Sequence, residues 1–97
     1  MRFLFMAFHY PRPEYRGDLL RAMHRFGVAL EAQPGLLQLA DFDDPANDRV
    51  VALSLWESAE HFRAGRANAA DALSDADFDL WETRPTEVFA LGEIVVS

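Results

Sequence analysis

The chain contains no cysteine among its 97 residues. This absence excludes disulfide bonds, thiolate metal ligands and thiol nucleophiles, and it is typical of proteins that fold in a reducing compartment. The sequence also lacks an apolar run of the roughly 18 residues that a membrane-spanning helix needs. The first expected strand begins almost at Met1, with no basic leader before it. We therefore expect a cytoplasmic protein with no membrane partner.

Basic residues are also scarce in this chain. Nine basic residues stand against 16 acidic ones, which leaves a formal net charge of −7. A field of this sign repels the phosphate backbone, so nucleic acid is not an expected partner. With 51% hydrophobic and 26% charged residues, the composition is that of a folded globular protein. The length predicts one domain over residues 1–97.

The hydrophobic pattern changes its period several times along the chain. Alternating or continuous apolar runs predict strands over residues 2–10, 36–42, 49–56 and 86–96. Helical spacing predicts one helix over residues 14–33, a second that starts after Ser58, and a short helical insertion within residues 75–85. The resulting β-α-β-β-α-β order predicts an α+β, ferredoxin-like fold with an antiparallel sheet.

The expected strands are apolar on both faces. In the third strand one face carries Val51, Leu53 and Leu55, and the other carries Val50, Ala52, Ser54 and Trp56. Two helices can cover only one face of such a sheet, and a large exposed apolar face marks an interaction surface. We therefore expect a homodimer that associates through a sheet face.

A short motif, Trp56-Glu57-Ser58, ends the expected third strand. Ser58 is expected to cap the second helix, and Trp56 to fill the junction between strand and helix. Residues 33–62 resemble the middle of the antibiotic biosynthesis monooxygenase family, and the resemblance extends over roughly residues 34–96. The matching positions are Pro34, Gly35, Leu36, Trp56, Glu57, Ser58 and Phe62.

The resemblance implies a dimeric α/β barrel with one cleft in each subunit, between the sheet and the helices. Some members oxidise aromatic polyketides with O₂ and no cofactor, and others degrade haem. Haem-degrading members use an asparagine on the first strand and a tryptophan and a histidine on the second helix. Here the first strand has no asparagine, Gly65 falls where that tryptophan would be, and no histidine follows Ala70. These departures disfavour haem degradation.

His9 is the candidate general base, because a histidine at a strand end can take a proton from a phenol or hydroquinone. The alternative is a strand-end side chain that only contacts solvent. Trp56 or Tyr10 is the candidate for orienting a substrate, although Trp56 is more simply a core residue. His61, in the first turn of the second helix, is a candidate substrate contact, or else a solvated side chain.

An apolar cleft is expected to bind a small aromatic molecule, with a lining of Phe3, Phe5, Phe62 and Trp81. The three histidines lack the spacing of a metal site, and no phosphate loop or cofactor motif is present, so neither a metal nor a cofactor is expected. The sequence therefore indicates a cofactor-independent monooxygenase that acts on a flat aromatic or quinol-like substrate. The alternative is a non-catalytic ligand-binding or stress-related protein on the same scaffold.

Overall fold

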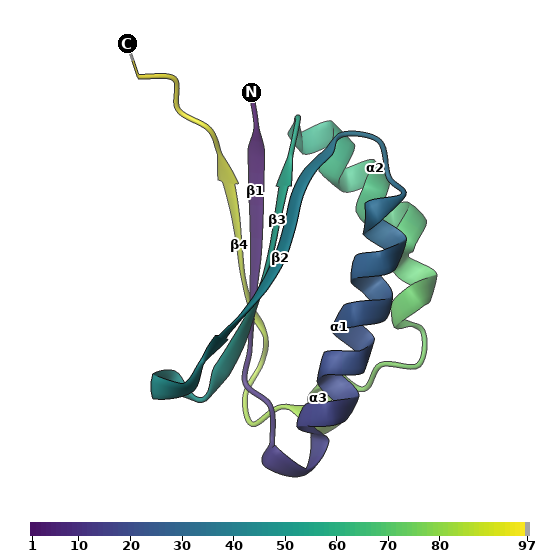
Figure 1. Ribbon diagram of the computed structural model, residues 1–97, viewed down its shortest axis with the longest axis vertical. Helices are drawn as coiled ribbons and strands as arrows, with labels where there is room; N and C mark the ends of the chain where they lie inside the picture. Colours follow the sequence, from purple (N-terminus) through teal and green to yellow (C-terminus); the bar gives the residue numbers. More distant parts are fainter. Residues whose placement is uncertain (97) are drawn as a thin grey trace.

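The computed structural model describes residues 1–96 and has an α+β fold. Its four strands form one antiparallel sheet in the order β2-β3-β1-β4, and Figure 1 shows the helices on one side of that sheet. The strands are β1 (Phe3–His9), β2 (Leu36–Asp44), β3 (Arg49–Trp56) and β4 (Glu87–Gly92). The helices are α1 (Arg16–Glu31), α2 (Ala59–Ala69) and α3 (Phe78–Trp81), with 3₁₀ turns at Pro13–Tyr15, Pro45–Asn47 and Ala70–Leu73. The ferredoxin-like arrangement predicted from the sequence is confirmed.

The connections follow from local chemistry. The β2–β3 hairpin turns at Asp48, whose φ of 50° lies in the left-handed region that aspartate tolerates better than most residues. The predicted cap of α2 is confirmed, because the Ser58 hydroxyl accepts a hydrogen bond of 3.1 Å from the backbone N–H of His61. Gly35, at a φ of 85°, lies beneath His61, and a Cβ there would be 2.4 Å from the His61 ring.

The tryptophan of the Trp-Glu-Ser motif anchors β3 to α2. Trp56 is fully buried, and its indole Nε1 donates a hydrogen bond of 2.9 Å to the Ser54 hydroxyl. A Cβ built on Gly65 of α2 would lie 2.6 Å from the Trp56 ring, so only glycine lets the helix approach this closely. The space that a side chain at position 65 would need is therefore occupied by the Trp56 ring.

The last strand is shorter than the sequence predicts. β4 pairs with β1 from Glu87 to Gly92, and Gly92 is opposite Phe3. Beyond that pair β1 has no further residues to pair with, so the ladder closes with a hydrogen bond of 2.9 Å from the Glu93 N–H to the Arg2 carbonyl. Ile94, Val95 and Val96 follow the strand and are exposed.

The two faces of the sheet have different surroundings. Phe3, Phe5, Ala7 and His9 of β1 face the helices. Leu4, Met6 and Phe8 face the opposite side, together with Val51, Leu55, Phe89 and Leu91. No helix in residues 1–96 covers this second face (Figure 1). Within the same residues, no helix is both long enough and apolar enough to cross a membrane.

Candidate functional site

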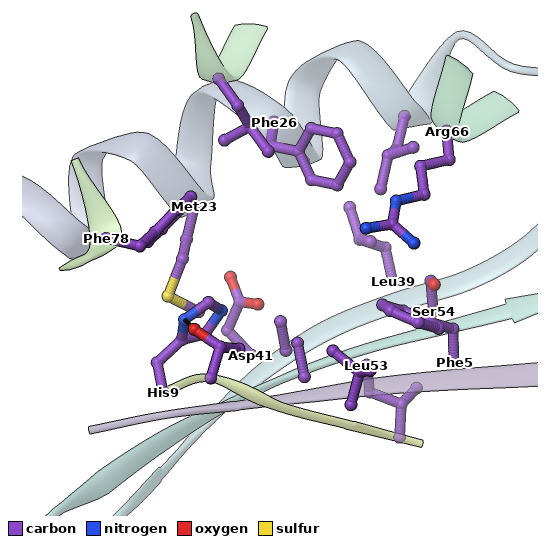
Figure 2. Close-up of a pocket in the computed structure, with 17 residues that line it drawn as sticks. Phe5, His9, Met23, Phe26, Leu39, Asp41, Leu53, Ser54, Arg66 and Phe78 are labelled. Atoms are coloured by element: carbon purple, nitrogen blue, oxygen red, sulfur yellow. Dashed lines mark hydrogen bonds between the residues drawn. The ribbon is translucent and has the colours of Figure 1, made fainter. Parts of the chain in front are cut away.

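A cavity of about 260 Å³ lies between α1 and the helix-covered face of the sheet. Figure 2 shows the residues that line it, which come from all three helices, the 3₁₀ turn at Ala70–Leu73, all four strands and the α3–β4 segment. The apolar part of the wall comprises Phe5, Met23, Phe26, Leu30, Leu39 and Phe78, among others. The polar part comprises His9, Asp41, Ser54, Arg66 and Thr86. Such a lining, apolar with a few convergent polar groups, is typical of a small-molecule site.

The floor of the cavity is open because small side chains meet there. Ala7 of β1 is opposite Ala52 of β3, and both line the cavity. Larger residues at the same register would fill this space from the sheet side. Across from them, Gly27 of α1 presents no side chain and leaves room for the Leu39 methyl group. The cavity therefore exists because three small residues, Ala7, Ala52 and Gly27, lie at facing positions.

His9 and Glu82 form a buried pair at one end of the cavity. The His9 Nδ1 lies 3.2 Å from the Glu82 Oε2, and both side chains are almost fully shielded from solvent. Glu82 also accepts hydrogen bonds from the Thr86 hydroxyl at 2.6 Å and from the Tyr10 backbone N–H at 2.8 Å. The His9 ring stacks on Phe78, with 5.4 Å between the ring centroids. Three donors and one aromatic contact thus hold the pair in place.

The protonation state of Glu82 decides which nitrogen of His9 can act. Burial raises the pKa of Glu82, but the hydrogen bonds from His9, Thr86 and the Tyr10 backbone outweigh it and hold that pKa below its usual value. An ionised carboxylate only accepts hydrogen bonds, so the His9 Nδ1 must donate. The His9 Nε2 is then the acceptor, and it has no hydrogen-bond partner within residues 1–96. This is the arrangement of a general base with an orienting carboxylate.

Asp41 supplies a second carboxylate near His9. It lines the cavity from β2, and Figure 2 shows its carboxylate and the His9 ring at the same end. Burial against the cavity raises the pKa of Asp41, and the nearby His9 and His24 offset part of that effect. Within residues 1–96, no group of three histidine, aspartate or glutamate side chains is placed to hold a metal ion.

Two of the residues predicted to form the site line the cavity, Phe5 and His9. Three others support that lining from behind. Phe3 and Phe62 pack against one another, and Phe62 stacks on Phe5 with ring centroids 4.6 Å apart. The Trp81 ring meets Phe78 edge to face at 5.8 Å. Phe3, Phe5 and Phe62 thus form one aromatic cluster, of which only Phe5 lines the cavity, whereas Trp81 packs separately against Phe78.

The remaining three candidates point elsewhere. Trp56 is buried beside Ser54 and does not line the cavity. The Tyr10 hydroxyl donates to Glu87, and the Arg84 guanidinium lies 4.0 Å above the Tyr10 ring. His61 hydrogen-bonds through Nδ1 to the Ser58 hydroxyl at 2.7 Å, on the outer side of α2. These side chains therefore make structural contacts, and none of them hydrogen-bonds to the His9 ring in residues 1–96.

Sequence reasoning missed four polar members of the site. Glu82 lies in the segment that is expected only as a short helical insertion, Thr86 at the start of the expected last strand and Asp41 in the expected second strand, and none of them is predicted as a site residue. Arg66 lies in the expected second helix, and no role is predicted for it from the sequence. The one available signal was Glu82 itself, a glutamate between Trp81 and Pro85 in a segment that carries two large aromatic residues.

Comparison with known proteins identifies the fold. No family model and no curated protein matches the chain by sequence. Among solved structures, Rv0793 from Mycobacterium tuberculosis matches with a TM-score of 0.84 at 17% identity, over 100% of this chain and 99% of that one. A structure named antibiotic biosynthesis monooxygenase matches at 0.78 and 12% identity, over 96% and 99% of the two chains. SnoaB, a cofactor-independent oxygenase from Streptomyces nogalater, matches at 0.77 and 14% identity, over 98% and 95%.

These matches cover nearly the whole of each chain. The protein therefore has the fold of the antibiotic biosynthesis monooxygenases, as its Trp-Glu-Ser motif predicted.

Proposed function

We propose that the protein is a cofactor-independent monooxygenase that oxidises a small, flat aromatic or quinol-like molecule with O₂. The observation that carries this proposal is the His9–Glu82 pair, whose free Nε2 lies at the wall of an apolar cavity. The shared fold with SnoaB, itself a cofactor-independent oxygenase, supports it. Substrate and activity are the parts of the proposal that experiment must supply.

The first step is a proton transfer. The His9 Nε2 accepts a proton from a phenol or from a ring CH₂ that is acidified by neighbouring aromatic rings. Glu82 keeps the imidazole in the required tautomer and stabilises the imidazolium that forms. The resulting substrate anion is electron-rich enough to give one electron to O₂. A dry apolar wall favours this step because it strengthens the interaction between His9 and Glu82.

The oxygen then divides between product and water. Superoxide and the substrate radical combine at the ring carbon, and the His9 imidazolium returns its proton to the peroxide. Loss of the second hydrogen of that carbon as a proton breaks the O–O bond. One oxygen atom stays as the new carbonyl, and the other leaves as hydroxide, which takes up that proton to form water. A CH₂ group and O₂ are thus converted to C=O and H₂O, with no outside reductant.

We also propose that the functional unit is a homodimer joined through the uncovered face of the sheet. This face is apolar on three strands, and Phe89 and Leu91 on β4 are 46% and 48% exposed. Contiguous apolar surface of this kind is rarely left exposed to water. A second copy of the same face is the matching partner, because an isologous dimer places like strands against one another. The expected mass in solution is then twice 11.0 kDa.

A second candidate is a non-catalytic ligand-binding protein. The observation in its favour is that Glu82 also ties β1 to the α3–β4 segment, through Tyr10 and Thr86. A buried pair with this many structural contacts would be retained for the fold even if no reaction occurred. The two candidates share the cavity and differ in whether His9 removes a proton.

Oxygen uptake with anthrone and naphthohydroquinone separates these candidates. Wild type is compared with His9→Gln, whose amide can still donate to Glu82, and with His24→Ala on the exposed side of α1. The monooxygenase proposal expects uptake above the uncatalysed rate, at least about a hundredfold slower in His9→Gln and unchanged in His24→Ala. Isotopically labelled O₂ should place one labelled atom in the anthraquinone carbonyl. Equal rates in wild type and His9→Gln would exclude His9 as the base.

A further inference from the structure

We infer that the cavity binds a flat aromatic molecule with a carboxylate or similar anionic group, which Arg66 holds at the end remote from His9. The inference rests on the proposed ligand cavity and adds the chemical class of what enters it. Arg66 lines the cavity from α2, and it is the only cationic side chain among the lining residues that the structure describes, apart from a protonated histidine. A guanidinium is a strong and geometrically selective partner for a carboxylate.

Arg66 has no carboxylate of its own. Its guanidinium lies over the rings of Phe5 at 5.3 Å and Phe62 at 5.9 Å, and it forms no ion pair within residues 1–96. Arg63, one turn away on the same helix, pairs instead with Glu60 at 3.4 Å. The two aromatic faces hold the Arg66 guanidinium at the cavity without consuming its hydrogen-bond donors.

A second donor lies at the same end. Ser54 is the cross-strand partner of Phe5, and it is buried and lines the cavity. Its oxygen accepts from the Trp56 Nε1, while its hydroxyl hydrogen has no side-chain or backbone acceptor in the described chain. Figure 2 shows Arg66 and Ser54 together near Phe5, and His9 with Asp41 at the other end. Ser54 can therefore donate to an oxygen of a group that Arg66 binds.

The distance between the two ends sets the length of the ligand. His9 is four positions after Phe5 in β1, which is about 13 Å between their Cα atoms at roughly 3.3 Å per residue. The space between them is lined mainly by apolar side chains, with Ala7 and Ala52 on one side and Phe26 on the other. A volume of about 260 Å³ is small for a ligand site, so two fused rings fit it better than a larger skeleton.

Charge decides which way round the ligand lies. Asp41 and Glu82 stand with His9 at one end, so an anionic group there would be repelled by carboxylates. The formal net charge of the protein is −7, so most of its surface repels an anion. Arg66, which has no acidic partner within residues 1–96, is a local site that attracts one. The anionic group therefore binds at Arg66, and the hydroxyl or acidic C–H of the ligand lies at the His9 Nε2.

The probe that matches this arrangement is 6-hydroxy-2-naphthoate, whose hydroxyl and carboxylate are at opposite ends of two fused rings. Its methyl ester has nearly the same shape but no charge. Binding of each is followed by naphthol fluorescence with wild type, Arg66→Gln and the control Arg63→Gln, near pH 7. We expect wild type and Arg63→Gln to bind the acid at least about tenfold more tightly than the ester. In Arg66→Gln this preference should disappear, with the affinity for the ester retained.

Three results would overturn the inference: equal binding of acid and ester by wild type, a preference that survives in Arg66→Gln, or no binding of either probe. None of them depends on turnover, so the binding test is separate from oxygen uptake. If the acid binds selectively but no substrate is oxidised, the anion site stands and the monooxygenase proposal fails. If neutral quinols are oxidised through His9 but the acid is not preferred over the ester, the monooxygenase proposal stands and the anion site fails.

Discussion

The His9 imidazole and the Glu82 carboxylate are 73 positions apart in the chain and meet at 3.2 Å at one end of the cavity. Each residue alone has a simple structural explanation, a strand-end histidine and a glutamate after a short helix. Together they form an oriented acid–base pair, because the carboxylate determines which imidazole nitrogen holds the proton. The chemistry proposed for the cavity depends on this pairing.

Replacement of Glu82 should reduce activity without removing the base. In Glu82→Gln the amide can donate as well as accept, so the His9 Nδ1 need no longer carry the proton and the imidazolium loses its counter-charge. We expect kcat to fall by about tenfold or more, and the acidic limb of the pH profile to shift, with KM little changed. Steady-state oxygen uptake across pH measures both effects. Glu31→Gln, at the exposed end of α1, is the control and should behave as wild type.

The Glu82 carboxylate should also make the free energy of unfolding depend on pH. The folded-state pKa of Glu82 lies below its usual value, so its stabilising contribution is present above the unfolded-state pKa of about 4.3 and is lost as pH falls through the lower, folded value. Urea unfolding of wild type and Glu82→Gln should therefore differ most near pH 6–7 and converge toward about pH 3. A difference that stays constant over this range would contradict the role assigned to the Glu82 charge.

Gly65 should be intolerant of any side chain. An added Cβ would lie 2.6 and 2.7 Å from two atoms of the buried Trp56 ring, which has no free space to move into. We expect Gly65→Ala to lower the free energy of unfolding by about 1–3 kcal/mol through overpacking, despite the higher helix propensity of alanine. Gly92→Ala is the matched control, because a Cβ there would meet nothing within 4 Å. Chemical denaturation that ranks the two variants equally would contradict the tight contact at Trp56.

The proposed homodimer can be tested with one charge on the uncovered sheet face. Leu91→Lys places a cation on a residue that is 48% exposed in the single chain and would be buried in the dimer. Val28→Lys, on the outer side of α1 at 52% exposure, is the control. Sedimentation velocity should show a monomer for Leu91→Lys and a dimer for wild type and Val28→Lys. A wild-type monomer at micromolar concentration would remove the homodimer from the proposal.

The fold could be predicted from the sequence because its signals are local. The change of hydrophobic period, the stop at Pro34 and the cap at Ser58 each act within a few residues, and each is present in the structure. The end of β4 could not be predicted this way, because it depends on where its partner β1 runs out. The sequence pattern indicates which residues suit a strand. The length of the strand depends on the neighbouring strand with which it pairs.

Only part of the site could be predicted from the sequence, because the rest depends on how distant segments pack. Alternation along one strand places Phe5 and His9 on the same face of the sheet, and the structure shows that the helices cover this face. Asp41 and Arg66 line the cavity and Glu82 contacts His9, each from a different segment, and these approaches depend on how the segments pack together. Trp56 was the opposite case, a prominent motif residue whose role is explained by one contact with Gly65.

The two alanines on the cavity floor separate the size of the site from its chemistry. Ala7 and Ala52 face one another across paired strands, and neither takes part in the hydrogen bonds of His9 and Glu82. Adding or removing a few methyl groups at these two positions would change the depth of the cavity while leaving the acid–base pair intact. A lineage that carries this scaffold can therefore exchange one substrate for another by single substitutions on the floor, with its reaction conserved.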